Sequence, residues 1–147
     1  MNVLSSLSLA GCFLLLGINR ISSIKKNTCA LNDALSFITM VKNNIRFSMM
    51  DYESLIECGK KEGYSYISFE NGVTLSKYAA KKAQADFLCF INKIGTTDET
   101  GQLMLCDEYL ERFKGYYNES ASNEKGRVKV VGALSVLSVV CAFLLGG

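Results

Sequence analysis

The chain has 147 residues, of which 49% are hydrophobic, with a formal net charge of +2 and no histidine, proline or tryptophan. This length allows one domain of ordinary size, and the lack of histidine excludes Ser-His-Asp and Cys-His catalysis and imidazole metal sites. Because proline is the strongest helix breaker, its absence favours long uninterrupted helices. We therefore predict an all-α protein, with a helical bundle or hairpin as its middle module, that is not an enzyme.

The N-terminal segment, residues 1–19, is predicted to be a transmembrane helix. It holds no charged residue and is close to the roughly 20 residues that a helix needs to cross a bilayer. A cleaved signal peptide would need a basic segment ahead of the apolar run, and this chain has none before Arg20. The Leu-Ala-Gly-Cys sequence at residues 9–12 has the form of a bacterial lipoprotein cleavage box. An exported lipoprotein acylated at Cys12, with an extracytoplasmic helical domain, is therefore the alternative hypothesis.

The C-terminal segment, residues 130–147, is also free of charge and is predicted to be a second transmembrane helix. Basic residues flank both segments on the side of the middle module, residues 20–129. They are Arg20, Lys25 and Lys26 after the first segment, and Lys125, Arg127 and Lys129 before the second. Because basic residues favour the cytoplasmic side of a membrane, we expect the module to face the cytoplasm.

The charge of the module itself argues against nucleic-acid binding. Residues 27–124 hold 10 basic and 14 acidic residues, a net charge of −4. Nucleic-acid binders neutralise phosphates with an excess of basic residues, whereas the net charge of this module is negative.

The first helix of the module is predicted to begin at a cap, Asn27 or Thr28, or to run on from the first span as one rod. Its expected buried positions follow helical spacing: Leu31, Ala34, Leu35, Ile38, Val41 and Ile45. Asp51 is expected to cap a second helix that ends at Glu62, with Gly63 as its stop.

Residues 64–72 alternate in polarity, which is typical of a strand, but a single strand has nothing to pair with. We therefore predict a loop or short helix that docks Ile67 and Phe69 against the bundle. The next helix is predicted to run from Leu75 to Ile94, with an apolar face and with solvent-exposed Lys81, Lys82, Asp86 and Lys93.

A corner motif follows, in which Gly95, Asp98 and Gln102 are the candidate structural residues. Gly95 permits a left-handed turn, and Thr96 lies three residues before Glu99, as in a capping box, with Asp98 as a second cap. Asp98 and Glu99 do not predict a catalytic pair, because adjacent helical residues point about 100° apart and no nucleophile accompanies them.

The last helix is predicted to start at Asp98, to pack antiparallel against the preceding one and to continue into the membrane, with Gly115 and Gly126 as its weakest points. Its expected seam alternates steps of three and four: Leu103, Cys106, Leu110, Phe113 and Tyr117. The six cysteines are nowhere closer than 17 positions, so we predict neither a metal nor a cofactor site. Cys12 and Cys141 lie in the predicted spans, and the other four, Cys29, Cys58, Cys89 and Cys106, are predicted to be small buried hydrophobic residues.

The aliphatic-Gly-x-x-Asp-x-x-x-Gln corner, followed by a charged helix, basic residues and an apolar span, resembles stage III sporulation protein AB of endospore-forming bacteria. The resemblance runs from about Asp86 to the C-terminus. It covers Phe87, Gly95, Asp98, Gln102 and Gly132. A second, weaker stretch of resemblance to this family runs from Asn44-Ile45-Arg46-Phe47 to Leu55-Ile56. The family usually has proline near residues 50–52 and a longer connection than residues 63–78 provide.

The resemblance implies a membrane component of the secretion-like complex between mother cell and forespore, in the outer forespore membrane on the mother-cell side. The family is similar to the platform protein of type II secretion systems, whose cytoplasmic helical domains contact an ATPase. The implied partners are a stage III sporulation protein AA-like ATPase and other membrane components of that complex. The resemblance implies no catalytic residues. A homo-oligomer is compatible with small residues in the last span, such as Gly132 and Ala133.

Overall fold

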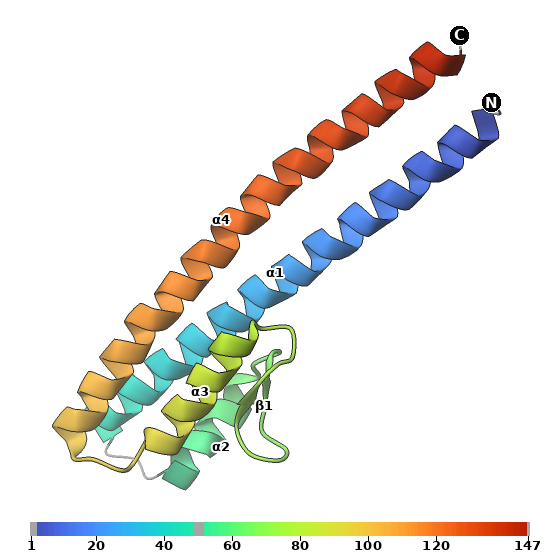
Figure 1. Ribbon diagram of the computed structural model, residues 1–147. Coiled ribbons are helices and arrows are strands. Elements are labelled where there is room, and N and C mark those ends of the chain that lie inside the picture. The colour runs from blue at the N-terminus through green and yellow to red at the C-terminus, as the bar shows by residue number, and fades with distance from the viewer. Residues whose placement is uncertain (1–2, 49–51, 147) are drawn as a thin grey trace. The chain divides into compact units, whose positions relative to one another are not determined.

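A computed structural model describes the backbone of residues 3–48 and 52–146 and, among their side chains, those of residues 11, 18, 19, 21–46, 52–134, 136, 137 and 140. The elements are α1 (Val3–Ser48), α2 (Tyr52–Glu62), β1 (Ile67–Ser68), β2 (Thr74–Leu75), α3 (Lys81–Lys93) and α4 (Glu99–Gly146) (Figure 1). The described chain is mostly helical, which confirms the predicted all-α class.

The chain divides into two units. Residues 26–119 form one unit, and residues 1–25 with 120–147 form the other. Two long helices, α1 and α4, pass from one unit into the other without interruption. Of the two alternatives for the first helix, the structure therefore shows the rod, and no helix begins at Asn27 or Thr28. Gly115 and Gly126 do not break α4 either.

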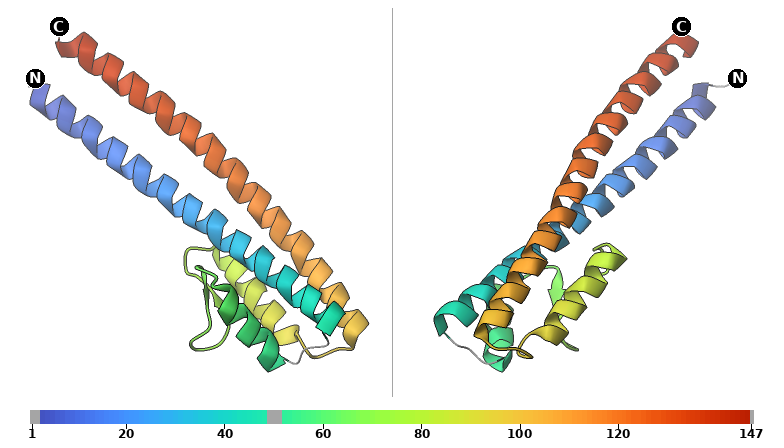
Figure 2. Two further views of the ribbon diagram at one scale, coloured as in Figure 1. Left: turned by 180° about the vertical axis from the view of Figure 1, so that it is seen from behind. Right: turned by 60° about the vertical axis from the view of Figure 1, so that its left-hand side comes forward.

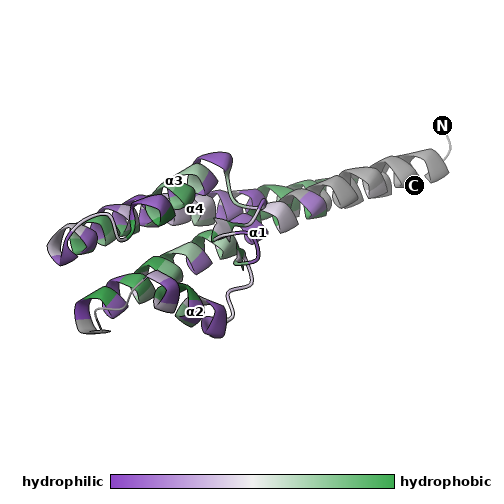
Figure 3. Ribbon diagram, turned by 90° about the horizontal axis from the view of Figure 1, so that it is seen from below, coloured by the Kyte–Doolittle hydropathy of each residue, from purple (hydrophilic) through white to green (hydrophobic). Residues whose placement is uncertain are grey.

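Within residues 26–119 the helices alternate in direction. Helix α2 runs back along α1, α3 runs in the direction of α1, and α4 returns antiparallel to α3 (Figures 1 and 2). In the hydropathy view, apolar residues of this unit gather on the sides of the helices that face one another (Figure 3). The predicted antiparallel packing of the last helix is confirmed, because Phe87 contacts Phe113 and Phe90 contacts Tyr109.

Phe37 lies at the centre of the core of this unit. Its side chain is fully buried, and its ring contacts those of Tyr64, Phe69 and Phe87 at centroid distances of 5.7–6.1 Å. Burying a phenylalanine contributes about 1.5–3 kcal/mol, and each aromatic pair adds about 0.5–1.5 kcal/mol. The predicted stripe of α1 is buried as expected except for Leu35, which is half-buried. Phe37 lies beside that stripe and was not predicted.

The segment between α2 and α3 forms a small hairpin, so the prediction of a loop or short helix for residues 64–72 is wrong. Ile67 pairs with Leu75 and Ser68 with Thr74 in an antiparallel register. The missing partner strand lies in residues that we expected to begin the next helix. The docking of Ile67 is confirmed, since it is buried, and Phe69 is half-buried against Phe37.

Helix α3 starts later in the chain than the sequence predicted. Helix α3 begins at Lys81 rather than Leu75, because Leu75 is held in the hairpin and residues 76–80 turn toward α1. Gly63 and Gly95 have φ angles of 71° and 79°, so both adopt the left-handed conformation expected where a helix ends. The predicted cap of α2, Asp51, lies outside the described residues.

The seam of α4 differs from the predicted one. Cys106, Tyr109 and Phe113 are the buried residues of its first five turns, whereas Leu103 and Leu110 are only half-buried. A strict a/d seam faces one partner helix. Here α4 faces α3 through Phe113 and α1 through the salt bridge between Lys42 and Asp107. Cys106 and Phe113 of the predicted seam are therefore buried as expected, but Tyr109 takes the place of Leu110.

Candidate functional site

The corner between α3 and α4 is built from short-range hydrogen bonds. The Asp98 carboxylate accepts a hydrogen bond from the backbone N–H of Gly101 at 3.0 Å. The backbone carbonyl of Asp98 accepts one from the backbone N–H of Gln102 at 2.9 Å. Gln102 donates from Nε2 to the carbonyl of Thr97 at 2.9 Å. A Cβ at Gly101 would lie 2.9 Å from the Asp98 carboxylate and the Thr97 hydroxyl. Gly95, Asp98 and Gln102 thus shape the turn and start α4.

Thr96 does not cap α4. Its hydroxyl donates to the carbonyl of Lys93 at 2.7 Å, at the end of the preceding helix. Because α4 begins at Glu99, the residue directly before it is Asp98, which takes the capping position. The second of the two predicted caps is therefore the one that forms. Residues 95–100 of the corner are exposed, and the hydrogen bonds of Asp98 and Gln102 go to the backbone of the turn.

A charged cluster joins α3 to α4 on the outside of the core. Asp86 accepts a hydrogen bond from the Tyr116 hydroxyl at 2.6 Å and lies 3.3 Å from Arg112, which also pairs with Glu108 at 2.7 Å. Burial, and next the bond to Asp86, raise the pKa of Tyr116 to about 12. The phenol therefore stays protonated near neutral pH and acts as a donor. Glu108 and Arg112 are four residues apart on α4, the spacing of a helical ion pair, whereas the contacts of Asp86 with α4 depend on tertiary packing.

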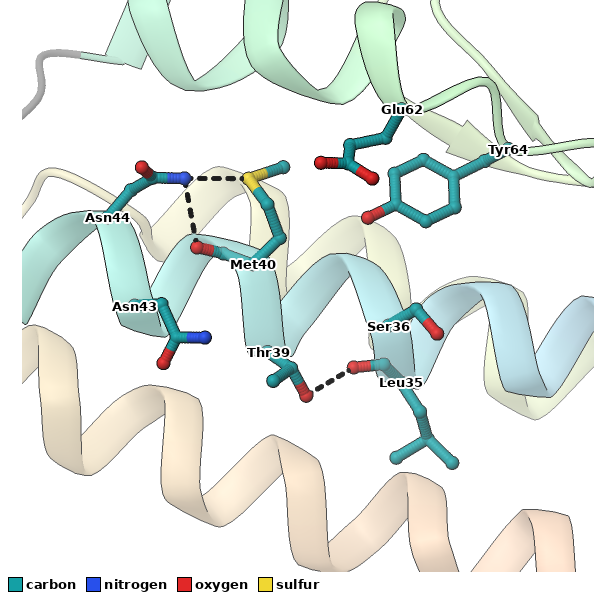
Figure 4. Close-up of a pocket in the computed structure, with 8 residues that line it drawn as sticks. All are labelled: Leu35, Ser36, Thr39, Met40, Asn43, Asn44, Glu62 and Tyr64. Atoms are coloured by element: carbon teal, nitrogen blue, oxygen red, sulfur yellow. Dashed lines mark hydrogen bonds between the residues drawn. The ribbon is translucent and has the colours of Figure 1, made fainter.

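An open groove of about 620 Å³ lies over α1, beside the end of α2 (Figure 4). Its lining residues are Leu35, Ser36, Thr39, Met40, Asn43, Asn44, Glu62 and Tyr64. The Asn44 amide donates to the carbonyl and the sulfur of Met40, and Thr39 donates to the carbonyl of Leu35. The Asn44 amide and the Thr39 hydroxyl are therefore engaged within α1, and the remaining polar side chains of the lining are those of Ser36, Asn43, Glu62 and Tyr64.

The cysteines follow the prediction only in part. Cys106 is fully buried, and burial raises the pKa of its thiol to about 11. Cys29 and Cys58 are half-buried, but Cys89 is exposed, so the expectation of buried cysteines is wrong for Cys89. Cys89 falls on the outer side of α3, next to Leu88, which is 48% exposed. Among the described residues, no three acidic or thiol side chains gather as a metal site would require.

The basic residues that flank the terminal segments are placed as follows. Lys125, Arg127 and Lys129 are exposed along α4, Lys25 is exposed on α1, and Lys26 is half-buried. The side chain of Arg20 lies outside the described part of the chain.

Beyond these basic residues, α4 exposes large apolar side chains. Leu134, Val136 and Leu137 have exposed fractions of 59–65%, and Val128, Val130 and Val140 are also exposed. Most side chains of the two predicted spans, residues 1–19 and 130–147, lie outside the described residues. Within the described part of the chain, no helix has a stretch both long and apolar enough to cross a membrane.

Comparison with known proteins adds no family to these observations. The chain matches no protein-family model, and no curated protein or solved structure is significantly similar to it.

Proposed function

We propose that this chain is a non-enzymatic membrane scaffold, anchored by residues 1–19 and 130–147, whose helical module of residues 20–129 faces the cytoplasm. The observation that carries the proposal is the row of exposed apolar side chains on α4 directly after Lys125, Arg127 and Lys129. Each Å² of apolar surface removed from water contributes about 25 cal/mol, so this row favours a lipid environment. The basic residues favour the cytoplasmic side for the module.

The resemblance to stage III sporulation protein AB supports a more specific role. By that resemblance the chain belongs to the secretion-like complex between mother cell and forespore, in the outer forespore membrane. The module would couple a stage III sporulation protein AA-like ATPase to a membrane channel, as the platform protein does in type II secretion systems. The corner of Gly95, Asp98 and Gln102, which carries the resemblance, would act by fixing the turn between α3 and α4.

Membrane anchoring and orientation are tested on the full chain in its host. We expect the protein to stay in the membrane pellet after extraction with alkaline carbonate. The thiol of Cys89, which is exposed, should react with a membrane-impermeant maleimide only after the cells are permeabilised. A Cys89→Ser variant identifies the signal from this thiol. Labelling in intact cells would contradict the cytoplasmic orientation and favour the exported lipoprotein acylated at Cys12.

The role in the complex is tested separately. We expect the ATPase to co-purify with the full chain from detergent-solubilised membranes of sporulating cells. Deletion of the gene should arrest sporulation after engulfment while leaving vegetative growth intact. Normal spores in the deletion strain would overturn the sporulation role without affecting the membrane anchoring.

A further inference from the structure

Lysines and tyrosines gather where α1 enters the unit of residues 26–119. The Nζ of Lys26 lies 4.7 Å from the ring centroid of Tyr78, and that of Lys77 lies 5.8 Å from it. Tyr78 is 42% exposed, and Lys81 and Lys82 are exposed on the first turn of α3. We call the surface formed by Lys26, Lys77, Tyr78, Lys81 and Lys82 the entry face.

Contacts with α1 fix the entry face at this end of the unit. The backbone N–H of Ala80 donates a hydrogen bond at 2.9 Å to Oδ1 of Asn27, which is the residue after Lys26. Ala79 is buried, and the ring of Tyr78 makes an edge contact with that of Tyr66 at 6.4 Å. Tyr78 is therefore held at the surface next to the point where α1 enters.

The helix that leaves the unit contacts the same turn of α3. The Nζ of Lys82 lies 5.6 Å from the ring centroid of Tyr116 on α4. Tyr116 is held by its hydrogen bond to Asp86, and α4 leaves the unit at Glu119, one turn later. Within residues 26–119, the segment that carries the entry face therefore contacts both α1 and α4.

The charge of the entry face is the reverse of that of the module. Residues 27–124 carry a net charge of −4, but the entry face holds four lysines. Within the described residues, none of these lysines forms a salt bridge, although five other salt bridges are present. Two acidic residues lie near Tyr116: Asp86, which accepts a hydrogen bond from its hydroxyl and pairs with Arg112, and exposed Glu119. The positive charge of these lysines is thus available to an anionic partner.

We propose that the entry face binds the anionic headgroups of the membrane that holds the chain's own terminal segments. This inference rests on the proposed membrane anchoring. Lysine stems lie along the headgroup layer with their ammonium groups toward phosphate, and tyrosine is enriched at the same depth. A membrane is favoured over other anionic partners because, beyond this end of the unit, both α1 and α4 carry basic residues and then a charge-free apolar sequence.

A single tryptophan tests the inference, because the chain contains none. The variant Tyr78→Trp reports on the entry face. The matched control is Tyr52→Trp, since Tyr52 is 43% exposed and begins α2 at the far end of the unit. That end is roughly 33 Å away, at 1.5 Å per residue along α1. Each full-length variant is reconstituted into phosphatidylcholine vesicles with and without phosphatidylglycerol, and quenching by a lipid with a spin label on its headgroup is measured.

We expect strong quenching of the tryptophan at position 78, further increased by phosphatidylglycerol, and little quenching at position 52. In the Tyr78→Trp background, Lys81→Gln with Lys82→Gln should remove most of the increase, because each lysine near an anionic surface is worth about a fivefold change in binding. Lys60→Gln with Lys93→Gln removes the same charge elsewhere and should leave the increase unchanged.

Failure of the inference and failure of the proposed anchoring give different results. If alkaline carbonate leaves the chain in the vesicles but the tryptophan at position 78 is quenched no more than that at position 52, the entry face does not bind headgroups. The same holds if the two double lysine variants behave alike. If carbonate extracts the chain, the proposed anchoring itself is wrong.

Discussion

Gly59 lies on the face of α2 that packs against two aromatic rings. A Cβ at this position would lie 2.9 Å from Cε2 of Phe37 and 3.0 Å from Cε1 of Phe69. Both rings belong to the core, so neither can move without disturbing further contacts. Close approach, and not conformational freedom, is the reason for glycine here, and nothing in the local sequence indicated it.

We therefore expect opposite effects from the same substitution at two helical glycines. Gly59→Ala should lower the free energy of unfolding by about 1–2 kcal/mol, because overpacking outweighs the gain in helix propensity. Gly115→Ala, where an added Cβ meets nothing within 4 Å, should raise it by up to about 1 kcal/mol. Urea unfolding of the full chain in mild detergent, followed by near-ultraviolet circular dichroism, measures both. Equal stability of Gly59→Ala and the wild type would contradict the packing explanation.

At the scale of elements, the hairpin depends on α1 for its position. The two strands have two residues each, too few to be stable alone. The carboxylate of Asp33 on α1 accepts the backbone N–H of Tyr66 at 2.9 Å, and Leu75 and Ile67 are buried in the core. Residues distant in sequence therefore hold the hairpin, which explains why residues 64–72 alone did not predict it.

Loss of the Asp33 carboxylate should loosen the hairpin while α1 remains helical. For Asp33→Ala we expect faster hydrogen–deuterium exchange at residues 66–75 and a loss of about 1.5–3 kcal/mol in the free energy of unfolding, as for a hydrogen bond to a charged group. Asn32→Ala, at the exposed neighbouring position, is the control and should change neither. Unchanged protection of Tyr66 in Asp33→Ala would show that strand pairing and burial suffice.

At the scale of the whole molecule, three phenols and one thiol that are buried or half-buried make the stability of the fold depend on alkaline pH. Burial is the main cause that raises the pKa values of Tyr64, Tyr109 and Tyr116 to about 12 and that of Cys106 to about 11. In the unfolded chain, these groups ionise near pH 10 and pH 8.5. Between these values and the raised ones, the folded state holds more protons, so its stability falls as pH rises.

We expect the urea midpoint to be independent of these groups below about pH 8 and to fall as pH rises from about 9 to 12. Tyr116→Phe should make that fall shallower, because it removes one of the ionising phenols, although it lowers stability near neutral pH by losing the bond to Asp86. Urea titrations at a series of pH values measure both effects. A wild-type midpoint that stays constant up to pH 12 would contradict the burial of these phenols.

Which segments form helices, and which residues of α1 form its buried stripe, could be predicted from the sequence because both depend on spacing within one element. The stripe of α1, the stops at Gly63 and Gly95 and the capping by Asp98 are such local features. Phe37, Tyr109 and the contacts of Asp86 were missed because each depends on which elements surround it. Periodicity identifies the face that a helix buries against one partner. Because α1 and α4 meet several partners, each also buries a residue beside that face, Phe37 on α1 and Tyr109 on α4.

The sequence by itself determined the mostly helical class, the order of the helices and the concentration of basic residues beside two charge-free termini. These properties follow from composition and from patterns a few residues long. Only the tertiary structure decided that residues 67–75 pair as a hairpin, that Gly59 must be small and that Lys26 lies over the ring of Tyr78. Each of these depends on contacts between residues distant along the chain, and packing in three dimensions sets them.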